Sequence, residues 1–203
     1  MPGDQRRSVS IRPLSAAQAV TRHRLLDATK ELATEGGYEA VGMSEVAERA
    51  GVSPATAYVH FASRDHLLME VLAELLAEST TAIRSECLEN AEGPMDRVVA
   101  LITVVGGAVQ NFLDNATFLH VALMRAYLAS AQIDEHARDL LVTAIGEWIG
   151  IALEDSDMPE VDALGETIQY VCFGAMVAVA TGQRTPSEIS GILERAARTF
   201  LGG

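Results

Sequence analysis

Apolar residues recur at intervals of three and four along most of the chain, whereas the strict alternation typical of half-buried strands is almost absent. This spacing predicts an all-α fold of about nine helices. The expected helices are 19–35, 45–50, 54–60, 64–90, 95–113, 116–131, 134–155, 159–182 and 186–201. Residues 1–18 are polar and carry arginines and two prolines, so we expect a flexible basic arm there.

Small polar residues, glycines and a proline set the expected helix boundaries in the N-terminal third. The first helix should end at the glycine pair 36–37, where a positive φ angle costs little. Ser44 should cap the second helix, which Gly51 closes. Ser53 should cap the third helix, with Pro54 at its first position, where a missing N–H does no harm.

Two short helices joined by a tight glycine turn, and held against a longer preceding helix, form a helix-turn-helix. Segments 45–50 and 54–60 fit this arrangement, with Gly51 and Ala47 small where the helix axes must approach closely. The second short helix, beginning at Pro54, would be the recognition element, and its N-terminal end would enter the DNA major groove.

The charge distribution divides the chain in the same way. Residues 1–66 hold eight basic and eight acidic residues, whereas residues 67–203 hold seven basic and twenty acidic ones, which accounts for the net charge of -13. Such asymmetry indicates parts with different functions. An acidic body disfavours indiscriminate attachment to polyanions, so any DNA contact should be confined to the N-terminal part.

Several protein classes are disfavoured by composition. Cys87 and Cys172 are too few and too far apart for a disulfide framework or a zinc site, and we expect neither a metal nor a cofactor. The first twenty residues lack the apolar centre of a signal peptide. The apolar run 170–182 is shorter than the ~20 residues of a membrane span. We therefore expect a cytoplasmic protein without membrane contact.

The string "RHRLLDATKELATEGGYEAVGMSEVAERAGVSPATAYVHFASRDHLLMEVL", residues 22–72, resembles the DNA-binding domain of the TetR family of transcriptional repressors. The residues that carry the resemblance are Ala28, Gly37, Tyr38, Val46, Ala47, Ala50, Gly51, Val52, Ser53, Tyr58, His60, Phe61, Ser63, Leu67 and Leu68. Two departures are visible. Arg64 stands where the family usually has lysine, which changes the geometry of the charge. The pair Pro54 and Ala55 replaces a more typical small residue followed by glycine, which affects the expected base preference.

The resemblance implies a homodimer on a palindromic double-stranded DNA operator, released when a small ligand binds the larger domain. The implied domains are residues 19–66 for DNA binding and residues 67–203 for ligand binding and dimerisation. The implied phosphate contacts are Ser44, Tyr58 and Arg64. The positions implied for the groove are Ser53, Pro54, Ala55, Thr56 and His60. Arginines placed to reach the minor groove or flanking phosphates are Arg6, Arg7, Arg12, Arg22 and Arg24.

Each of these residues also has a purely structural interpretation. Tyr58 could be a core tyrosine with a surface hydroxyl, His60 could shield Phe61, and Thr56 could be an ordinary exposed helix residue. The arm arginines could be no more than a solvated tail. These alternatives stay open at the level of the sequence.

The acidic part offers an apolar set of effector-binding candidates with a few polar groups, as a hydrophobic ligand requires. The candidates are Leu101, Val105, Phe118, Val121, Met124, Arg125, Tyr127, Trp148, Tyr170, Phe173 and Met176. Plain core packing is the alternative for every apolar member. We expect Arg125 to be a buried charge, which needs a partner. That partner is either an acidic residue or an effector carboxylate or phosphate.

In the TetR family, the last two long helices of each subunit form a four-helix dimer interface, which implies this role for segments 159–182 and 186–201. Small residues in the first of these, including Gly174, would permit close helix crossing. The stretches "LLDATKELATEGGYEAV" and "MRAYLAS" are similar to the actinobacterial repressors of cholesterol catabolism within the family, which respond to steroid acyl-CoA thioesters. An acyl-CoA or steroid-CoA effector is therefore implied.

Two other function classes compete with this interpretation. A helical enzyme, or a small-molecule-binding protein without DNA binding, would use the apolar site alone, and a helical adaptor would use only the dimerisation surface. The sequence has no His-Glu-x-x-His motif, no phosphate-cradling glycine loop and no Gly-x-Ser-x-Gly. We therefore predict no catalytic residue. The adaptor hypothesis leaves the element from Ser53 to Arg64 unexplained.

Overall fold

The computed structural model describes residues 15–89, 96–97, 101, 118–152, 161–185, 188, 191–192 and 195. Within these ranges the regular secondary structure consists of helices and contains no strand, which confirms the all-α prediction. Arg6, Arg7, Arg12 and Val105 lie outside the described residues, as do most of the expected segments 95–113 and 186–201.

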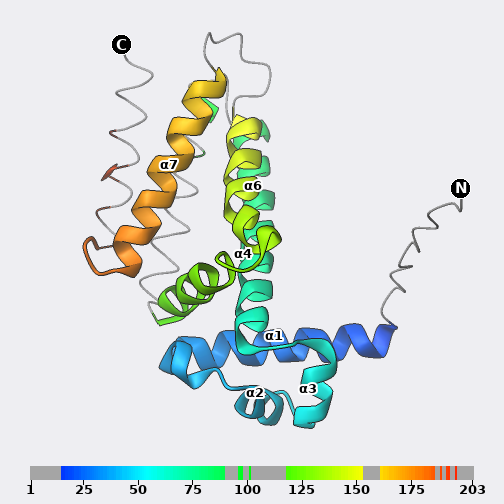
Figure 1. Ribbon diagram of the computed structural model, residues 1–203. Coiled ribbons are helices and arrows are strands. Elements are labelled where there is room, and N and C mark those ends of the chain that lie inside the picture. The colour runs from blue at the N-terminus through cyan, green and yellow to red at the C-terminus, as the bar shows by residue number, and fades with distance from the viewer. Residues whose placement is uncertain are drawn as a thin grey trace, which may run out of the picture.

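The helices from α1 to α4 follow one another with short connections (Figure 1). In chain order they are α1 (Ala16–Gly36), the 3₁₀ turn η1 (Tyr38–Ala40), α2 (Met43–Arg49), α3 (Pro54–His60), α4 (Arg64–Glu89), a helix spanning 118–130, α6 (Glu135–Ala152) and α7 (Val161–Ala180). Helix 118–130 is designated by its residues. The bounds of the labelled α-helices fall within three residues of those expected from the sequence.

A side-chain cap marks the beginning of α1, whereas α2 begins without one. The Ser15 hydroxyl accepts a hydrogen bond from the N–H of Gln18, whose side chain accepts one from the N–H of Ser15, which is a capping box. Residues 16–18, expected in the arm, are therefore helical. The prediction that Ser44 caps α2 was wrong. Gly42 is the N-cap in extended backbone, and Ser44 lies one residue inside the helix.

Two glycines end helices as expected. Gly37 follows α1 with φ of 68°, and its N–H donates to the carbonyl of Ala33 at 2.9 Å. Gly51 follows α2 with φ of 66°. Both angles lie in the left-handed half of the map, where glycine is favoured because it has no Cβ.

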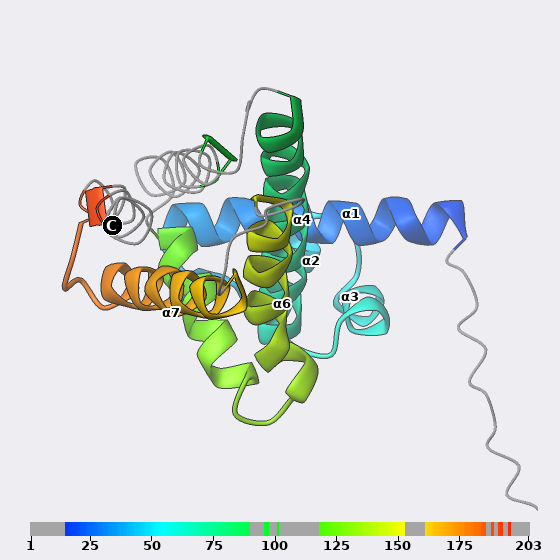
Figure 2. The same ribbon diagram turned by 90° about the horizontal axis from the view of Figure 1, so that it is seen from above.

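The molecule has a base formed by α1, α2 and α3, from which α4 rises (Figure 1). Helix α1 lies across the base with α2 and α3 on its lower side, and it packs against α4. Helix α6 runs beside α4, and α7 packs against α6, as the view from above also shows (Figure 2). Helix α4 thus connects the base directly to the upper helices. No helix within the described ranges is both long enough and apolar enough for a bilayer crossing.

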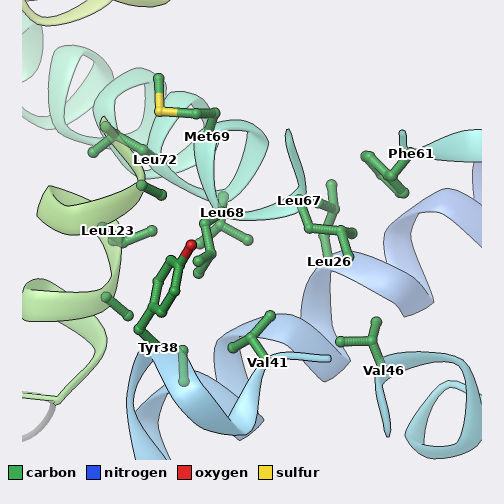
Figure 3. Close-up of a cluster of buried hydrophobic side chains, with 14 of the residues drawn as sticks. Leu26, Tyr38, Val41, Val46, Phe61, Leu67, Leu68, Met69, Leu72 and Leu123 are labelled. Atoms are coloured by element: carbon green, nitrogen blue, oxygen red, sulfur yellow. The ribbon is translucent and has the colours of Figure 1, made fainter. Parts of the chain in front are cut away.

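The base and the upper helices share one continuous hydrophobic core. In the base, Leu26, Val41 and Phe61 are buried. Tyr38 is buried where the base meets the upper part, between Leu68 of α4 and Leu123 of helix 118–130 (Figure 3). Because no gap divides this core, a displacement of helix 118–130 must be accommodated by side chains of the base.

Candidate nucleic-acid interface

The turn between α2 and α3 favours glycine because Gly51 has a positive φ. A Cβ at this position would also lie 2.7 Å from Nη2 of Arg24 and would displace the end of that side chain. The turn is closed by hydrogen bonds from the N–H of Gly51 to the carbonyl of Glu48 (3.0 Å) and from the N–H of Val52 to that of Ala47 (2.9 Å). The sequence prediction of a tight glycine turn is confirmed. The contact also places the exposed Arg24 side chain next to the turn.

Helix α3 begins with the predicted cap. Ser53 has extended backbone, its hydroxyl accepts from the N–H of Thr56 at 3.1 Å, and Pro54 occupies the first helical turn. The hydroxyls of Ser53 and Thr56 also share a hydrogen bond of 2.9 Å. Both hydroxyl groups therefore hold the start of α3, and the half-buried Thr56 is less accessible than Ser53, Pro54 and Ala55 before it.

One face of α3 is exposed and the other enters the core. Ala57 is completely buried, whereas Pro54, Ala55, Tyr58 and Val59 are exposed. Tyr58 is 58% exposed and Val59 is 78% exposed, which rules out the alternative of Tyr58 as a core residue. Val59 was missed by the sequence analysis, although its spacing of four from Ala55 places both on one helical face.

His60, at the C-terminal end of α3, is half-buried beside the buried Phe61, with the two ring centroids 6.4 Å apart. Phe61 in turn meets the His66 ring edge-on at 5.4 Å. This packing supports the interpretation that His60 shields Phe61, and the exposed face of α3 runs from Pro54 to Val59.

The structure does not present Arg22 and Arg24 in the same way. Arg22 forms an ion pair with Glu70 of α4, and its guanidinium lies 5.1 Å from the centre of the Phe61 ring. It therefore joins α1 to α4 inside the base, and its expected role at the DNA surface stays a prediction. Arg24 remains exposed next to Gly51. Ser44 is exposed at the second position of α2.

Helix α2 is also tied to α1 through Arg49, which donates to both carboxylate oxygens of Glu35, at 3.0 and 2.9 Å, and to Glu31 at 3.0 Å. The hydrogen bond from Arg49 holds the pKa of Glu35 below its usual value. This two-point contact fixes the orientation of the guanidinium. It therefore holds α2, and with it the turn to α3, against α1.

Arg64 begins α4 at the edge of the base. Its guanidinium carbon lies 4.1 Å from the centre of the Tyr38 ring, and its Nη1 is 3.7 Å from Oε2 of Glu39. The Tyr38 hydroxyl donates to Oδ1 of Asp65 at 2.6 Å. Burial, and then this hydrogen bond, raise the pKa of Tyr38 above its usual value. Tyr38 therefore stays protonated and fixes the first turn of α4 against η1.

Arg125 is not the buried charge expected from the sequence, because its side chain is 55% exposed. It donates to Oε1 of Glu39 at 2.6 Å, and its guanidinium carbon lies 4.0 Å from the centre of the Tyr38 ring. Of the two partners left open by the sequence, the structure shows the acidic residue. Glu39 is thus contacted by arginines from two helices that are distant in sequence.

The candidate effector residues separate into buried and exposed groups. Buried or half-buried are Leu101, Met124, Tyr127, Trp148 and Phe173. Phe118, Val121 and Tyr170 are 61%, 39% and 69% exposed, so their predicted place in an apolar interior was wrong. Helix 118–130 is apolar on both sides, and periodicity cannot decide which side faces inward. The side chain of Met176 lies outside the described residues.

The buried members have defined partners. The Tyr127 ring meets that of Phe173 edge-on at 6.2 Å, and its hydroxyl donates to the carbonyl of Arg138 at 3.1 Å. Burial raises the pKa of Tyr127. Trp148 donates its indole N–H to the Thr80 hydroxyl at 2.7 Å. These residues connect helix 118–130, α6, α7 and α4.

Comparison with known proteins agrees with this geometry. Residues 25–71 match the family described as bacterial regulatory proteins, tetR family. The chain is 30% identical, over 194 residues, to the HTH-type transcriptional repressor KstR of Rhodococcus jostii, and the match covers 93% of this chain and 86% of that protein.

Solved structures have the same fold. One is a TetR transcriptional regulator from Rhodococcus sp. RHA1, which is 25% identical, has a TM-score of 0.63, and is matched over 93% of this chain and 99% of that one. Another is Thermus thermophilus FadR, a TetR family transcriptional repressor in complex with lauroyl-CoA, which is 20% identical with a TM-score of 0.65, over 89% of this chain and 93% of that one.

Proposed function

Since the chain belongs to the TetR family of bacterial regulatory proteins, we propose that it is a ligand-responsive repressor that binds a palindromic operator as a homodimer. Membership of this family makes it a DNA-binding transcriptional regulator, and the enzyme alternative is set aside. The observation that carries the proposal is α3: a short helix with a fixed N-terminal cap and an exposed face, held on the core of the base.

The proposed DNA contacts fall into two classes. Tyr58, Arg64, Ser44 and Arg24 would contact phosphates, which orient the protein without reading sequence. The other exposed residues of α3, Pro54, Ala55 and Val59, would lie in the major groove, with Ser53 and Thr56 at its entrance. An apolar side chain such as Val59 is suited to contact a thymine methyl group.

The test is a gel shift with DNA upstream of the protein's own gene, at several salt concentrations. A repressor should bind a palindromic segment and weaken steeply with salt, because phosphate contacts release counterions. Tyr58→Phe and Arg64→Gln should weaken binding to every sequence alike. Thr56→Ala should alter base preference. Absence of binding to any duplex would contradict the proposal, and unchanged preference in Thr56→Ala would remove Thr56 from the groove.

The homodimer is proposed to form through α7 and segment 186–201, which the sequence predicts to be helical. On α7, Tyr170 is 69% exposed and Gly174, four residues later, is also exposed. A large aromatic side chain beside a glycine on an open helical face is suited to close packing against a second helix. A dimer would also place two α3 helices ~34 Å apart, one helical turn of DNA.

The proposed effector is a small hydrophobic molecule, and the candidate class is an acyl-CoA or steroid-CoA thioester. Supporting observations are the sequence resemblance to repressors of cholesterol catabolism and two separate aromatic contacts among the upper helices, that of Tyr127 with the half-buried Phe173 and that of Trp148 with Thr80 of α4. Thus the remaining candidates for ligand contact are Leu101, Met124, Tyr127, Trp148 and Phe173. Effector binding would tilt α4 and change the spacing between the two α3 helices of the dimer.

Thermal-shift measurements with a steroid-CoA, a straight-chain acyl-CoA and CoA alone test the effector class. A specific effector raises the melting temperature by mass action, and CoA alone should not. Trp148 is the single tryptophan, so its fluorescence reports on the contact between α6 and α4 at Thr80. If neither thioester shifts the melting temperature, the proposed class is wrong. Equal dimer geometry with and without effector would contradict the tilting of α4.

A further inference from the structure

Glu39 is shared unequally between two arginines. Its Oε1 is 2.6 Å from Nη1 of Arg125, within hydrogen-bonding distance, whereas its Oε2 is 3.7 Å from Nη1 of Arg64, which is an ion pair without a hydrogen bond. Both guanidinium groups lie over the Tyr38 ring. The carboxylate therefore belongs mainly to Arg125, and Arg64 keeps its hydrogen-bond donors largely free of it.

The rest of this cluster is held in place by packing. Tyr38 is buried between α4 and helix 118–130, and its hydroxyl is fixed by Asp65 (Figure 3). The ring is a rigid support for both guanidinium groups. By contrast Glu39 is 69% exposed and lies on the short η1 turn, so its side chain can rotate. The cluster thus combines a fixed ring with one movable carboxylate.

We propose that Arg125 is a positioning residue for DNA binding: by holding Glu39, it keeps Arg64 available to a DNA phosphate. This inference rests on the proposed function, in which Arg64 contacts the DNA backbone. Without Arg125, the carboxylate of Glu39 can turn both oxygens to Arg64. A two-point arginine–carboxylate pair uses the same planar donors that a phosphate requires. Arg125 belongs to the upper helices and itself need not touch DNA.

The first experiment compares Arg125→Gln with Arg84→Gln in the full-length protein, using the operator fragment found by gel shift. Arg84 is a matched control because it is 53% exposed and pairs with a single carboxylate, Glu147, at 3.4 Å. We expect Arg125→Gln to weaken DNA binding about tenfold, equivalent to about 1.4 kcal/mol, and Arg84→Gln to stay within about twofold of wild type. Arg125→Lys, which retains a cation for Glu39, should recover most of the affinity.

The salt dependence separates positioning from a structural effect. Loss of a phosphate contact lowers the slope of log affinity against log salt by about one per contact. Arg125→Gln should therefore lower the slope as Arg64→Gln does. A variant that merely loosens the fold would lower the melting temperature instead. We expect the melting temperatures of Arg125→Gln, Arg84→Gln and wild type to agree closely, because exposed ion pairs contribute little to stability.

A double-mutant cycle with Glu39→Gln identifies the route of the effect. If Arg125 acts by holding Glu39, the neutral glutamine side chain of the Glu39→Gln variant no longer competes for Arg64. Arg125→Gln should then cost less than about twofold in the Glu39→Gln background. A tenfold loss that persists there would mean that Arg125 acts through its own charge, and the inference would be overturned. Wild-type affinity in Arg125→Gln would overturn it as well. Failure of wild type to bind any duplex would instead contradict the proposed function itself.

Discussion

Trp148 of α6 donates its indole N–H to the Thr80 hydroxyl of α4, with 2.7 Å between Nε1 and Oγ1. Thr80 in turn donates to the carbonyl of Leu76 in its own helix at 3.0 Å. The hydroxyl therefore acts as both acceptor and donor, and the mostly buried indole N–H depends on it. This contact fixes the upper part of α4, the helix that begins at the DNA-binding base.

Replacement of Thr80 by valine should be costly because it removes the acceptor and leaves the Trp148 N–H without its partner. A buried donor left unpaired costs about 1–3 kcal/mol. Thr81→Val is the matched control, since Thr81 is exposed and its hydroxyl only donates back to Ala77 at 3.1 Å. Urea denaturation should show a lower unfolding free energy for Thr80→Val than for Thr81→Val. Equal values would mean that the indole contact contributes nothing.

The two serines near the starts of α2 and α3 should respond differently to alanine. Ser53 caps α3 through the N–H of Thr56, and its loss should cost about 1 kcal/mol and weaken DNA binding by fraying the recognition helix. Ser44 lies inside α2 and caps nothing, so Ser44→Ala should leave the unfolding free energy unchanged. Ser44→Ala weakens DNA binding only if Ser44 contacts a phosphate. A large loss of stability in Ser44→Ala would contradict the assignment of Gly42 as the cap.

Val59 should contribute to base preference although its side chain has no charge and forms no hydrogen bonds. At 78% exposed it is the most open large apolar residue of α3. Val59→Ala should reduce discrimination at one operator position by about 1 kcal/mol, as one mismatched base pair does. Competition binding with single-base operator variants measures this. Val142→Ala, at a 49% exposed position of α6, is the control and should leave the preference unchanged. If Val59→Ala discriminates among the operator variants as well as Val142→Ala does, Val59 lies outside the groove.

The sequence predicted the elements whose causes are local. Ser53, Pro54 and Gly51 act within a few residues of themselves, through a cap, a fixed φ and a positive φ, and the structure has α3 with its predicted bounds. The prediction that Ser44 caps α2 was wrong because Gly42, two residues earlier, adopts the extended N-cap backbone. Serine and glycine are both acceptable N-cap residues, so the sequence did not distinguish them. Local chemistry therefore determined the presence of α2 more firmly than its first residue.

Contacts between distant segments were not predictable. Arg125 and Glu39 are 86 positions apart, and no sequence pattern around either residue indicates that they pair. Helix 118–130 has Leu119 and Leu123 inside but Phe118 and Val121 outside, so its pattern does not identify an inner face. Arg22 was expected at the DNA because it is basic and N-terminal, but Glu70 and Phe61 hold it within the base.

Tyr38 should make stability fall at alkaline pH. Its pKa is raised in the folded state by burial and by the hydrogen bond to Asp65, so the unfolded chain loses the proton first as pH rises. The stabilisation is fully present below pH ~10, the usual tyrosine pKa, and is lost as pH rises through the folded pKa. Melting temperatures measured from neutral to strongly alkaline pH should fall less steeply above pH ~10 for Tyr38→Phe than for wild type. Parallel curves would mean that Tyr38 does not contribute to the alkaline loss.

Gly174 offers a test of the dimer interface that leaves the single chain intact. It is exposed on α7, and a Cβ built there lies more than 4 Å from every atom of the described residues, so the described part of its own subunit leaves room there. Leucine should even favour the helix, by about 1 kcal/mol relative to glycine. If α7 packs closely against the partner subunit, however, the added side chain occupies the space that the partner helix needs.

Sedimentation analysis should therefore show a folded monomer for Gly174→Leu at concentrations where wild type is a dimer. Operator affinity should fall with dimerisation, because both half-sites must be occupied together. Gly150→Leu is the matched control, since Gly150 is an exposed glycine on α6 and a Cβ there also meets no atom within 4 Å. A Gly174→Leu protein that stays dimeric and binds the operator as wild type does would place the interface elsewhere than on this face of α7.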